Sequence, residues 1–267
     1  MEQQNGSRTL LRGLDILHAV SSVPEPTLTQ IARATGLAKS TTSRFLSVLV
    51  QEGYLRIDGE QRYRLAPRML ELGFSALRGL GVSELLMPPL QDIADLCKGA
   101  ANIGELVGPD VIMIARRTSR DQRERFYSMN INIGTKLPAL TTATGRALLA
   151  LDDTHLEEAL EQRRVNRSAT GQPNDEKEVR AHLKQVRKDG VARVRGQLAP
   201  GFGAVAIPLR VSATRVVAFS GSYLLADHGP DIENQVERLL RERSQGVLEL
   251  LQASDGVPPR TEPKEKR

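Results

Sequence analysis

The sequence contains one cysteine, few aromatic residues and no tryptophan, and these shortages narrow the classes of protein to which it could belong. A single cysteine, Cys97, cannot form an intrachain disulfide, so the chain suits a reducing compartment such as the cytoplasm. Cys97 follows Leu96 in an apolar pattern, and we expect a small buried hydrophobe there, with a reactive thiol as the alternative. Because aromatic residues make up only 3% of the chain, the core must be mainly aliphatic.

Long apolar runs, metal-binding patterns and catalytic motifs are also missing. No uninterrupted apolar run approaches about 18 residues, and the N-terminal stretch lacks the apolar centre of a signal peptide, so we expect no membrane partner. The four histidines are widely scattered and show no metal-ligand spacing. No Walker, GxSxG or GxGxxG element occurs in the required context, and the sequence therefore predicts no metal and no cofactor.

Aliphatic residues are abundant, and their spacing predicts a small helical part at the start of the chain. Residues 1–7 are polar and are expected to be loose, and residues 8–21 have helical periodicity. Thr27 and Gln30 form a capping box for a second helix, and a third helix follows the turn at Gly36. Alternation around Asp58-Gly59 then indicates a β-hairpin. Three helices and a hairpin predict a winged helix-turn-helix over residues 7–68.

The remainder of the chain has a different order of elements. Helical periodicity over residues 69–86, weakened at Gly79 and Gly81, predicts a connecting helix. Residues 87–253 read as a helix to Cys97, a hairpin, a strand at 125–133, three helices, three strands and a long final helix. This order predicts an α+β fold with a largely antiparallel sheet. Residues 254–267 are rich in proline and charge and are expected to be disordered.

The third helix carries different side chains on its two sides. Thr42, Phe45, Leu46 and Leu49 recur at helical spacing and are expected to face the core. Short hydroxyl side chains on the other side would let the helix approach a DNA major groove, where an arginine could reach a guanine and a lysine at the helix start a phosphate. The residues predicted for this DNA-facing side are Lys39, Ser40, Thr41, Ser43 and Arg44.

The charge distribution supports a nucleic-acid partner. Residues 32–68 contain seven basic and three acidic residues, a local charge of +4 in a chain whose total is +5. In the hairpin, Arg62 and Arg64 share one face of a strand and could follow the phosphate backbone, and Thr27 at the start of the second helix is a further candidate contact. A protein-interaction module with a solvated Ser/Thr-rich helix is the alternative interpretation.

Three stretches, at residues 28–73, 136–150 and 198–209, resemble the IclR family of bacterial transcriptional regulators. They read LTQIARATGLAKSTTSRFLSVLVQEGYLRIDGEQRYRLAPRMLELG, KLPALTTATGRALLA and LAPGFGAVAIPL, and they occur in the order typical of the family. The resemblance implies that a GAF-like effector-binding domain follows the winged helix. It also implies homodimers or homotetramers that bind two-fold operators in double-stranded DNA.

The resemblance further implies an effector pocket, whose residues can be carried over by position. Thr142, Ala143 and Thr144 would form a hydroxyl-lined helix start that suits a carboxylate, and Ser220 and Ser222 would share one face of the last strand. This chain departs from the common family pattern in two places. Arg195-Gly196-Gln197 stands where many members have an acidic pair, and Ala204 stands where many have cysteine. Arg195 would favour an anionic effector, with a surface charge at a strand edge as the alternative.

These features together predict an effector-responsive DNA-binding transcriptional regulator. The effector would be a small organic acid, such as an aromatic or ring-cleavage carboxylate from a catabolic pathway, and RNA polymerase is a candidate partner. The alternative is an enzyme that acts on a small organic acid and carries a DNA-tethering domain, but the proposed pocket lacks a nucleophile–base pair. The arginine-rich residues 116–125 are interpreted as a solvated hairpin end or subunit contact rather than a ligand or DNA contact.

Overall fold

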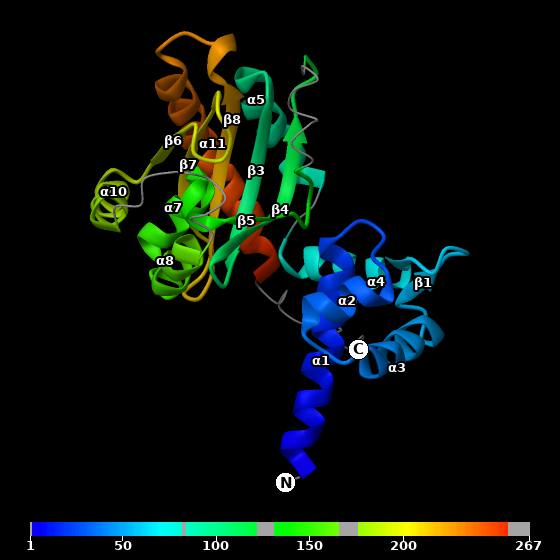
Figure 1. Ribbon diagram of the computed structural model, residues 1–267. Helices are drawn as coiled ribbons and strands as arrows, with labels where there is room; N and C mark the ends of the chain where they lie inside the picture. The colour runs from blue at the N-terminus through cyan, green and yellow to red at the C-terminus, as the bar shows by residue number, and fades with distance from the viewer. Residues whose placement is uncertain (1, 82–83, 122–130, 166–175, 256–267) are drawn as a thin grey trace, which may run out of the picture. The chain divides into compact units, whose positions relative to one another are not determined.

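The computed structural model describes residues 2–81, 84–121, 131–165 and 176–255, and the chain divides into two compact units, residues 1–76 and 77–267 (Figure 1). The first unit contains α1 (Glu2–Ser22), α2 (Leu28–Thr35), α3 (Lys39–Gln51), β1 (Leu55–Ile57) and β2 (Tyr63–Leu65), and α4 (Arg68–Gly79) crosses the boundary between the units. The three helices and the hairpin predicted from the sequence are therefore present. The expectation of a loose start is wrong for residues 2–7, because α1 begins at Glu2, and Met1 lies outside the described residues. Polarity alone does not oppose a helix when glutamate and glutamine are good helix formers.

The first unit is held together by one small aliphatic core. Ile16 and Val20 of α1, Ile31 of α2, Leu46 of α3 and Leu55 of β1 are buried together. The start of α2 is fixed by the predicted capping box, in which the Gln30 Oε1 atom accepts a hydrogen bond from the Thr27 backbone N–H at 2.8 Å. The end of α2 is Gly36, whose φ of +66° is readily adopted only by glycine.

The predicted connecting helix over residues 69–86 is shorter than expected. Helix α4 ends at Gly79, and a 3₁₀ turn follows at Glu84–Leu86 after the undescribed residues 82 and 83. Glycine is a poor helix former, and Gly81 adopts a left-handed φ of +71° that a continuing α-helix cannot contain. The two glycines therefore end the helix rather than merely weaken it.

The second unit is built on a six-stranded antiparallel sheet with the strand order β5-β4-β3-β8-β7-β6. Its strands are β3 (Ala100–Val107), β4 (Asp110–Thr118), β5 (Lys136–Pro138), β6 (Ala192–Arg195), β7 (Phe202–Arg210) and β8 (Val216–Leu224). Its helices are α5 (Met87–Cys97), α7 (Ala143–Leu151), α8 (Leu156–Val165), α10 (Glu176–Asp189) and α11 (Ile232–Asp255), with further 3₁₀ turns at Ala139–Thr141 and Leu225–Asp227. The predicted α+β fold is confirmed.

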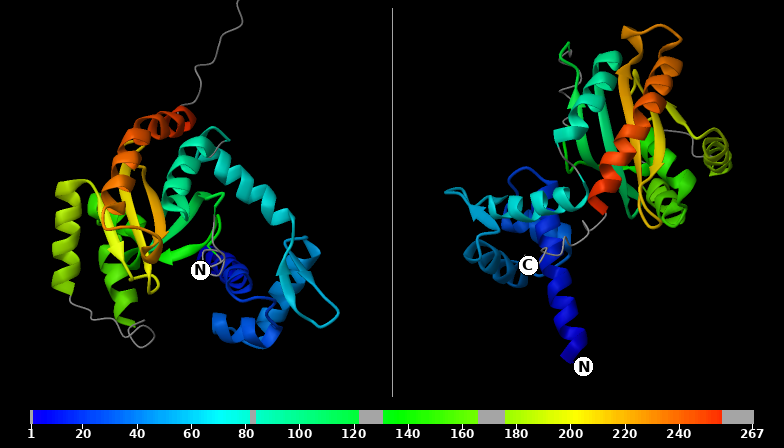
Figure 2. Two further views of the ribbon diagram at one scale, coloured as in Figure 1. Left: turned by 90° about the horizontal axis from the view of Figure 1, so that it is seen from above. Right: turned by 180° about the vertical axis from the view of Figure 1, so that it is seen from behind.

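Two hydrophobic layers cover the sheet, one on each face. Helices α5 and α11 pack against one face, and α7 packs against the other, with α10 behind it (Figure 2). On β8 the side chains alternate, so that Phe219 and Tyr223 join the α5/α11 layer whereas Ser220 and Ser222 face the opposite side. Cys97 is fully buried in the α5/α11 layer, as its sequence context predicted.

Most of the predicted strand at residues 125–133 lies outside the described residues. Its described end, residues 131–133, is not a strand. The sheet instead gains the short strand β5, which pairs with the start of β4. The predicted disordered tail also lies outside the described residues, except that α11 continues to Asp255. No helix in the described part of the chain has the length and apolar character that a membrane crossing requires.

Candidate functional site

Helix α3 has one side buried in the core of the first unit and a polar side that is exposed. Thr42 and Leu46 are buried, and the Thr42 hydroxyl donates to the backbone oxygen of Ala38 at 3.1 Å. Lys39 and Arg44 are exposed, and within the described chain neither has an acidic partner. Of the hydroxyl residues predicted to face DNA, Ser40 and Ser43 are exposed and Thr41 is half-buried. An unpaired cation at each end of a short-chained face is suited to contact phosphates and base edges.

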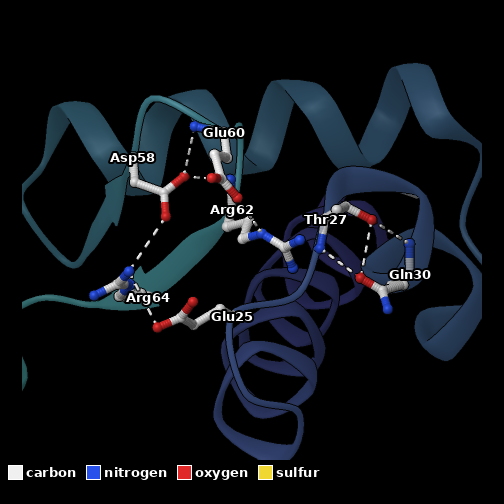
Figure 3. Close-up of polar contacts among 7 residues, drawn as sticks. All are labelled: Glu25, Thr27, Gln30, Asp58, Glu60, Arg62 and Arg64. Atoms are coloured by element: carbon white, nitrogen blue, oxygen red, sulfur yellow. Dashed lines mark hydrogen bonds and ion pairs between the residues drawn. The ribbon is translucent and has the colours of Figure 1, made fainter.

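Unlike the cations of α3, the arginines of the hairpin form ion pairs with acidic residues of the same unit (Figure 3). Arg62 pairs with Glu60 at 3.1 Å, and Arg64 pairs with Glu25 at 3.1 Å and with Asp58 at 3.3 Å. In Figure 3 the Arg62 guanidinium extends toward the start of α2, whereas that of Arg64 lies between Asp58 and Glu25. The guanidinium groups of the two arginines therefore point in different directions, each toward acidic partners, and their role in following a phosphate backbone stays a prediction.

Local hydrogen bonds favour the ionised form of the Asp58 carboxyl group in the hairpin. The Asp58 Oδ1 atom accepts from the backbone N–H of Arg62 at 2.9 Å and from that of Glu60 at 3.0 Å. The first of these bonds, supported by the second and by Arg64, lowers the pKa of Asp58 below its usual value. The hydroxyl of Thr27 is likewise engaged, because it donates to Gln30 Oε1 at 3.0 Å within the capping box.

In the second unit, one cavity lies between the sheet and the start of α7. Six of the seven residues predicted for the effector pocket line it: Thr142, Ala143, Thr144, Ala204, Ser220 and Ser222. They meet there because the 3₁₀ turn Ala139–Thr141 and the N-terminus of α7 lie over the same sheet face that the even-numbered residues of β8 occupy. The cavity measures about 60 Å³ as the space open to the centre of a water molecule, which corresponds to about four to six waters.

Several hydroxyl groups line the cavity, and two of them are hydrogen-bonded to each other. Thr144 Oγ1 lies 3.1 Å from Ser220 Oγ, and Ser220 Oγ donates to the backbone oxygen of Asn102 at 3.4 Å. Ser222 Oγ donates to the backbone oxygen of Ala100 at 3.2 Å. Thr142 caps α7 by accepting from the backbone N–H of Gly145 at 3.0 Å. The remaining surface is largely aliphatic and aromatic, and it includes Met113, Ile131, Leu137, Val194, Leu198 and Phe202.

Arg195 does not face this cavity, so that part of the predicted pocket is wrong. Its side chain is exposed, and its Nε atom donates to Glu233 Oε1 at 2.6 Å. The preceding residue on β6, Val194, lines the cavity, and strand alternation therefore turns Arg195 to the opposite face. The hydrogen bond to Glu233 raises the pKa of Arg195, which keeps the pair charged at the surface. The alternative interpretation, a surface charge at the strand edge, is the one that the structure supports.

Arg116 lines the cavity instead, although the sequence placed it in a solvated hairpin end. It sits opposite Asn102 in the β3–β4 register, and its Nη1 atom donates to Asn102 Oδ1 at 2.5 Å. Burial lowers the pKa of the Arg116 guanidinium, and among the described residues that line the cavity it is the sole charged side chain. Its neighbours Arg117 and Arg120 are exposed, as expected for a hairpin end, and residues 122–125 lie outside the described chain.

A β-bulge explains why alternation along β4 did not reveal Arg116. Ile103 pairs with Ala115 whereas Gly104 pairs with Met113, so Ile114 is an extra residue on β4. Met113 faces the cavity, and without the bulge the same face would next receive Ala115 and Arg117. The extra residue reverses the parity and brings Arg116 to the cavity side. A bulge has no reliable single-sequence signal here, because residues 111–115 are uniformly apolar.

A further arginine, Arg146, is buried close to the residues that line the cavity, whereas Arg116 is half-buried. Arg146 of α7 donates to the backbone oxygen of Leu140 at 2.8 Å and also to Gln197 Oε1. Burial, together with the nearby Arg163, lowers the pKa of Arg146 to about 10, so it stays charged at neutral pH. Gln197 therefore ties the loop before β7 to the helix that carries the hydroxyl residues. Within the described chain, no three His, Cys, Asp or Glu side chains are grouped as metal ligands.

Comparisons with known proteins cover both units. The family model described as bacterial transcriptional regulator IclR C-terminal matches residues 74–254, and the IclR helix-turn-helix domain matches residues 9–59. The Pca regulon regulatory protein of Pseudomonas putida is 32% identical over 212 residues, which are 79% of this chain and 72% of that protein.

Solved structures with the same fold include two bacterial proteins. A transcriptional regulator from Rhodococcus sp. RHA1 is 30% identical with a TM-score of 0.67 and covers 92% of this chain and 97% of its own. An IclR homologue from Microbacterium hydrocarbonoxydans, solved in complex with 4-hydroxybenzoate, is 21% identical with a TM-score of 0.73 and covers 92% and 99% of the two chains.

Proposed function

Because the chain belongs to the IclR family of bacterial transcriptional regulators, we propose that it binds a two-fold DNA operator and that a small carboxylate in its cavity changes that binding. The related proteins are transcriptional regulators, and the chain is a regulator of this type and not an enzyme. Its place of action would be the cytoplasm, where its DNA is found.

The observation that carries the proposal is the division of α3 into two faces. Leu46 lies in the core of the first unit, whereas Ser40, Ser43 and Arg44 are exposed on the same helix. Side chains this short allow the helix backbone to approach DNA closely, and an arginine without an acidic partner can bond a guanine edge or a phosphate. Lys39 stands at the helix N-terminus, where free backbone N–H groups also favour phosphate. Because Arg62 and Arg64 are paired with acidic residues, we assign them a lesser role than α3.

A two-fold operator requires two copies of the chain, and exposed apolar residues support such an assembly. Leu10, Leu11 and Leu14 of α1 are 66%, 59% and 44% exposed, and Leu70 and Phe74, one helical turn apart on α4, are each 57% exposed. Large side chains grouped in this way are costly in water and typical of protein interfaces. We propose that a second copy covers them, which would place two α3 helices at half-sites about 34–36 Å apart.

The cavity suits one small organic acid. A space for about four to six waters, each about 30 Å³ in the liquid, corresponds to a short-chain or monocyclic compound. The structural neighbour with bound 4-hydroxybenzoate and the relative that regulates the Pca regulon make an aromatic or ring-cleavage acid the favoured effector. Binding would shift the population between two states of different operator affinity, with α4 as the connecting element.

Gel-shift titration of the DNA upstream of the protein's own gene and neighbouring genes tests this function. The parent chain should bind at least one fragment, and Arg44→Ala should weaken that binding by about 5- to 150-fold per half-site, as expected for loss of one arginine–base pair. The control is Arg243→Ala, which removes the same charge from an exposed ion pair between α11 and Asp92 of α5. Effector affinity, measured by calorimetry, should be equal in all three proteins.

Two results would contradict the proposal in different ways. Equal operator affinity for the parent and Arg44→Ala would remove Arg44 from DNA recognition. Failure of the parent chain to bind every fragment at moderate salt would favour the protein-interaction alternative for the first unit.

A further inference from the structure

We propose that Arg116 and Asn102 form the carboxylate subsite of the cavity, and that Thr144 and Ser220 form a second subsite for a ligand hydroxyl. The ligand class is therefore a small hydroxylated monocarboxylate whose apolar body separates the two polar groups. The inference rests on the proposed function, since it concerns the same cavity, and it goes beyond that function by naming the groups that select the ligand.

The first step is the position of these residues in the sheet. Arg116 of β4, Asn102 of β3 and Ser220 of β8 are direct partners in register, so they form one row across three neighbouring strands. Residues opposite each other in antiparallel strands project to the same face, and all three line the cavity. Because strands lie about 4.8 Å apart, the backbone positions of Arg116 and Ser220 are separated by about 10 Å. The row thus has a cationic end and a hydroxyl end.

At the cationic end of the row, the Arg116 guanidinium is suited to bind an anion. Within the described chain, Arg116 makes one polar contact, the hydrogen bond to the neutral amide oxygen of Asn102, and no Asp or Glu is among the described lining residues. A guanidinium has five N–H donors in a planar fork that matches a carboxylate. Removing it from water without a counter-charge is costly, so a bound anion recovers interactions that the free protein lacks. The Asn102 amide is neutral, so among the described residues that line the cavity no group balances the charge of Arg116.

The hydroxyl end has a defined direction. The backbone oxygen of Asn102 has no hydrogen, so Ser220 must donate the 3.4 Å bond between them. Ser220 must then accept the 3.1 Å bond from Thr144. The Thr144 oxygen retains acceptor lone pairs, and a ligand that approaches it should therefore present an O–H donor. This selects a hydroxyl over a carbonyl at that end of the ligand.

The apolar wall accounts for the body of the ligand. Met113, Leu137 and Phe202 line the same cavity as these polar groups. An aromatic or short aliphatic body would bury its surface there and gain about 25 cal/mol per Å² of apolar area. A dicarboxylate would place its second charge against a wall that has no second cation among its described lining residues.

Calorimetric titration of the full-length chain with 4-hydroxybenzoate, benzoate and the neutral 4-hydroxybenzamide tests the assignment. The parent should bind 4-hydroxybenzoate most tightly. Arg116→Met should lower carboxylate affinity by roughly 10- to 100-fold, as expected for a charge-assisted pair, and should remove the preference for acid over amide. Arg116→Lys should retain part of that preference, because it keeps the charge and loses the fork. The control Arg195→Met removes an exposed arginine that pairs with Glu233 and should change affinity less than twofold.

A separate variant tests the hydroxyl subsite. Thr144→Val has nearly the same shape and lacks the acceptor oxygen, so it should reduce the affinity for 4-hydroxybenzoate to that for benzoate and leave benzoate unchanged. Equal unfolding temperatures of each variant and the parent would show that folding is intact. If Arg116→Met is unstable, Arg116→Lys tests the anion subsite in its place.

The outcomes separate this inference from the proposed function. Unchanged carboxylate affinity in both Arg116 variants would overturn the anion subsite, as would failure of the parent to bind either acid at millimolar concentration. Unchanged selectivity in Thr144→Val would overturn the hydroxyl subsite. Arg116-dependent binding that leaves operator affinity unaltered would support the inference and contradict the proposed regulation.

Discussion

Replacing Leu46 by alanine should unfold the first unit while leaving the second intact. Leu46 is fully buried and packs in one cluster with Ile16, Ile31 and Leu55. Truncating a buried leucine costs about 2–5 kcal/mol, because the transfer free energy of the lost carbons adds to that of the cavity left behind. A unit of this size with a single core has a free energy of unfolding of about 3–5 kcal/mol. The substitution therefore removes most or all of the stability that holds α3 in place.

The control for this change is Val48→Ala on the same helix. Val48 is 55% exposed, so its truncation should alter the free energy of unfolding by less than about 0.5 kcal/mol. Circular dichroism during heating would follow the helices of both units, gel shift would follow operator binding, and calorimetry would follow effector binding. In Leu46→Ala the part of the helical signal that comes from the first unit should be lost before heating begins. The variant should also lose most operator binding, yet keep the parent's effector affinity. Equal stability of the two variants would refute the argument that the buried face of α3 positions its polar face.

Two further predictions concern charge and the thiol. Lys39→Ala should reduce the slope of log affinity against log salt by about one per winged helix, because an unpaired cation at a helix N-terminus releases one counterion on binding phosphate. Arg62→Ala should reduce that slope less, since Arg62 pairs with Glu60; equal reductions in a salt series of gel shifts would contradict this ranking. Burial raises the pKa of Cys97 far above its usual value, so the reactive thiolate is scarce at neutral pH. Iodoacetamide should therefore label Cys97 only after denaturation, and mass spectrometry that finds rapid labelling of the native chain would show the thiol to be accessible.

The helices and the α3 faces could be predicted because their signals are local. The capping box of Thr27 and Gln30 depends on residues three positions apart, and Thr42 and Leu46 are buried because they lie one turn apart on one side of α3. The residues predicted for the cavity came from motif resemblance, and the structure brings six of the seven together, four of them with hydroxyl side chains. Their role in binding an effector remains a proposal.

Charged side chains were harder to place, because several of their partners are distant in the sequence. Arg64 pairs with Glu25, on the loop before α2, and Arg195 pairs with Glu233 of α11. Neither pairing leaves a periodic trace in the sequence. Both arginines were therefore expected at functional surfaces, although the structure gives each of them an acidic partner.

The sequence by itself determined the order of elements, the core-facing and exposed sides of α3, and the presence of hydroxyl groups at the start of α7. Tertiary structure decided which arginine enters the cavity. One extra residue, Ile114, reverses the parity of β4 and turns Arg116 inward, while unbroken alternation on β6 points Val194 inward and Arg195 outward. The physical reason is that strand side chains alternate with a period of two, so a single bulge exchanges the two faces.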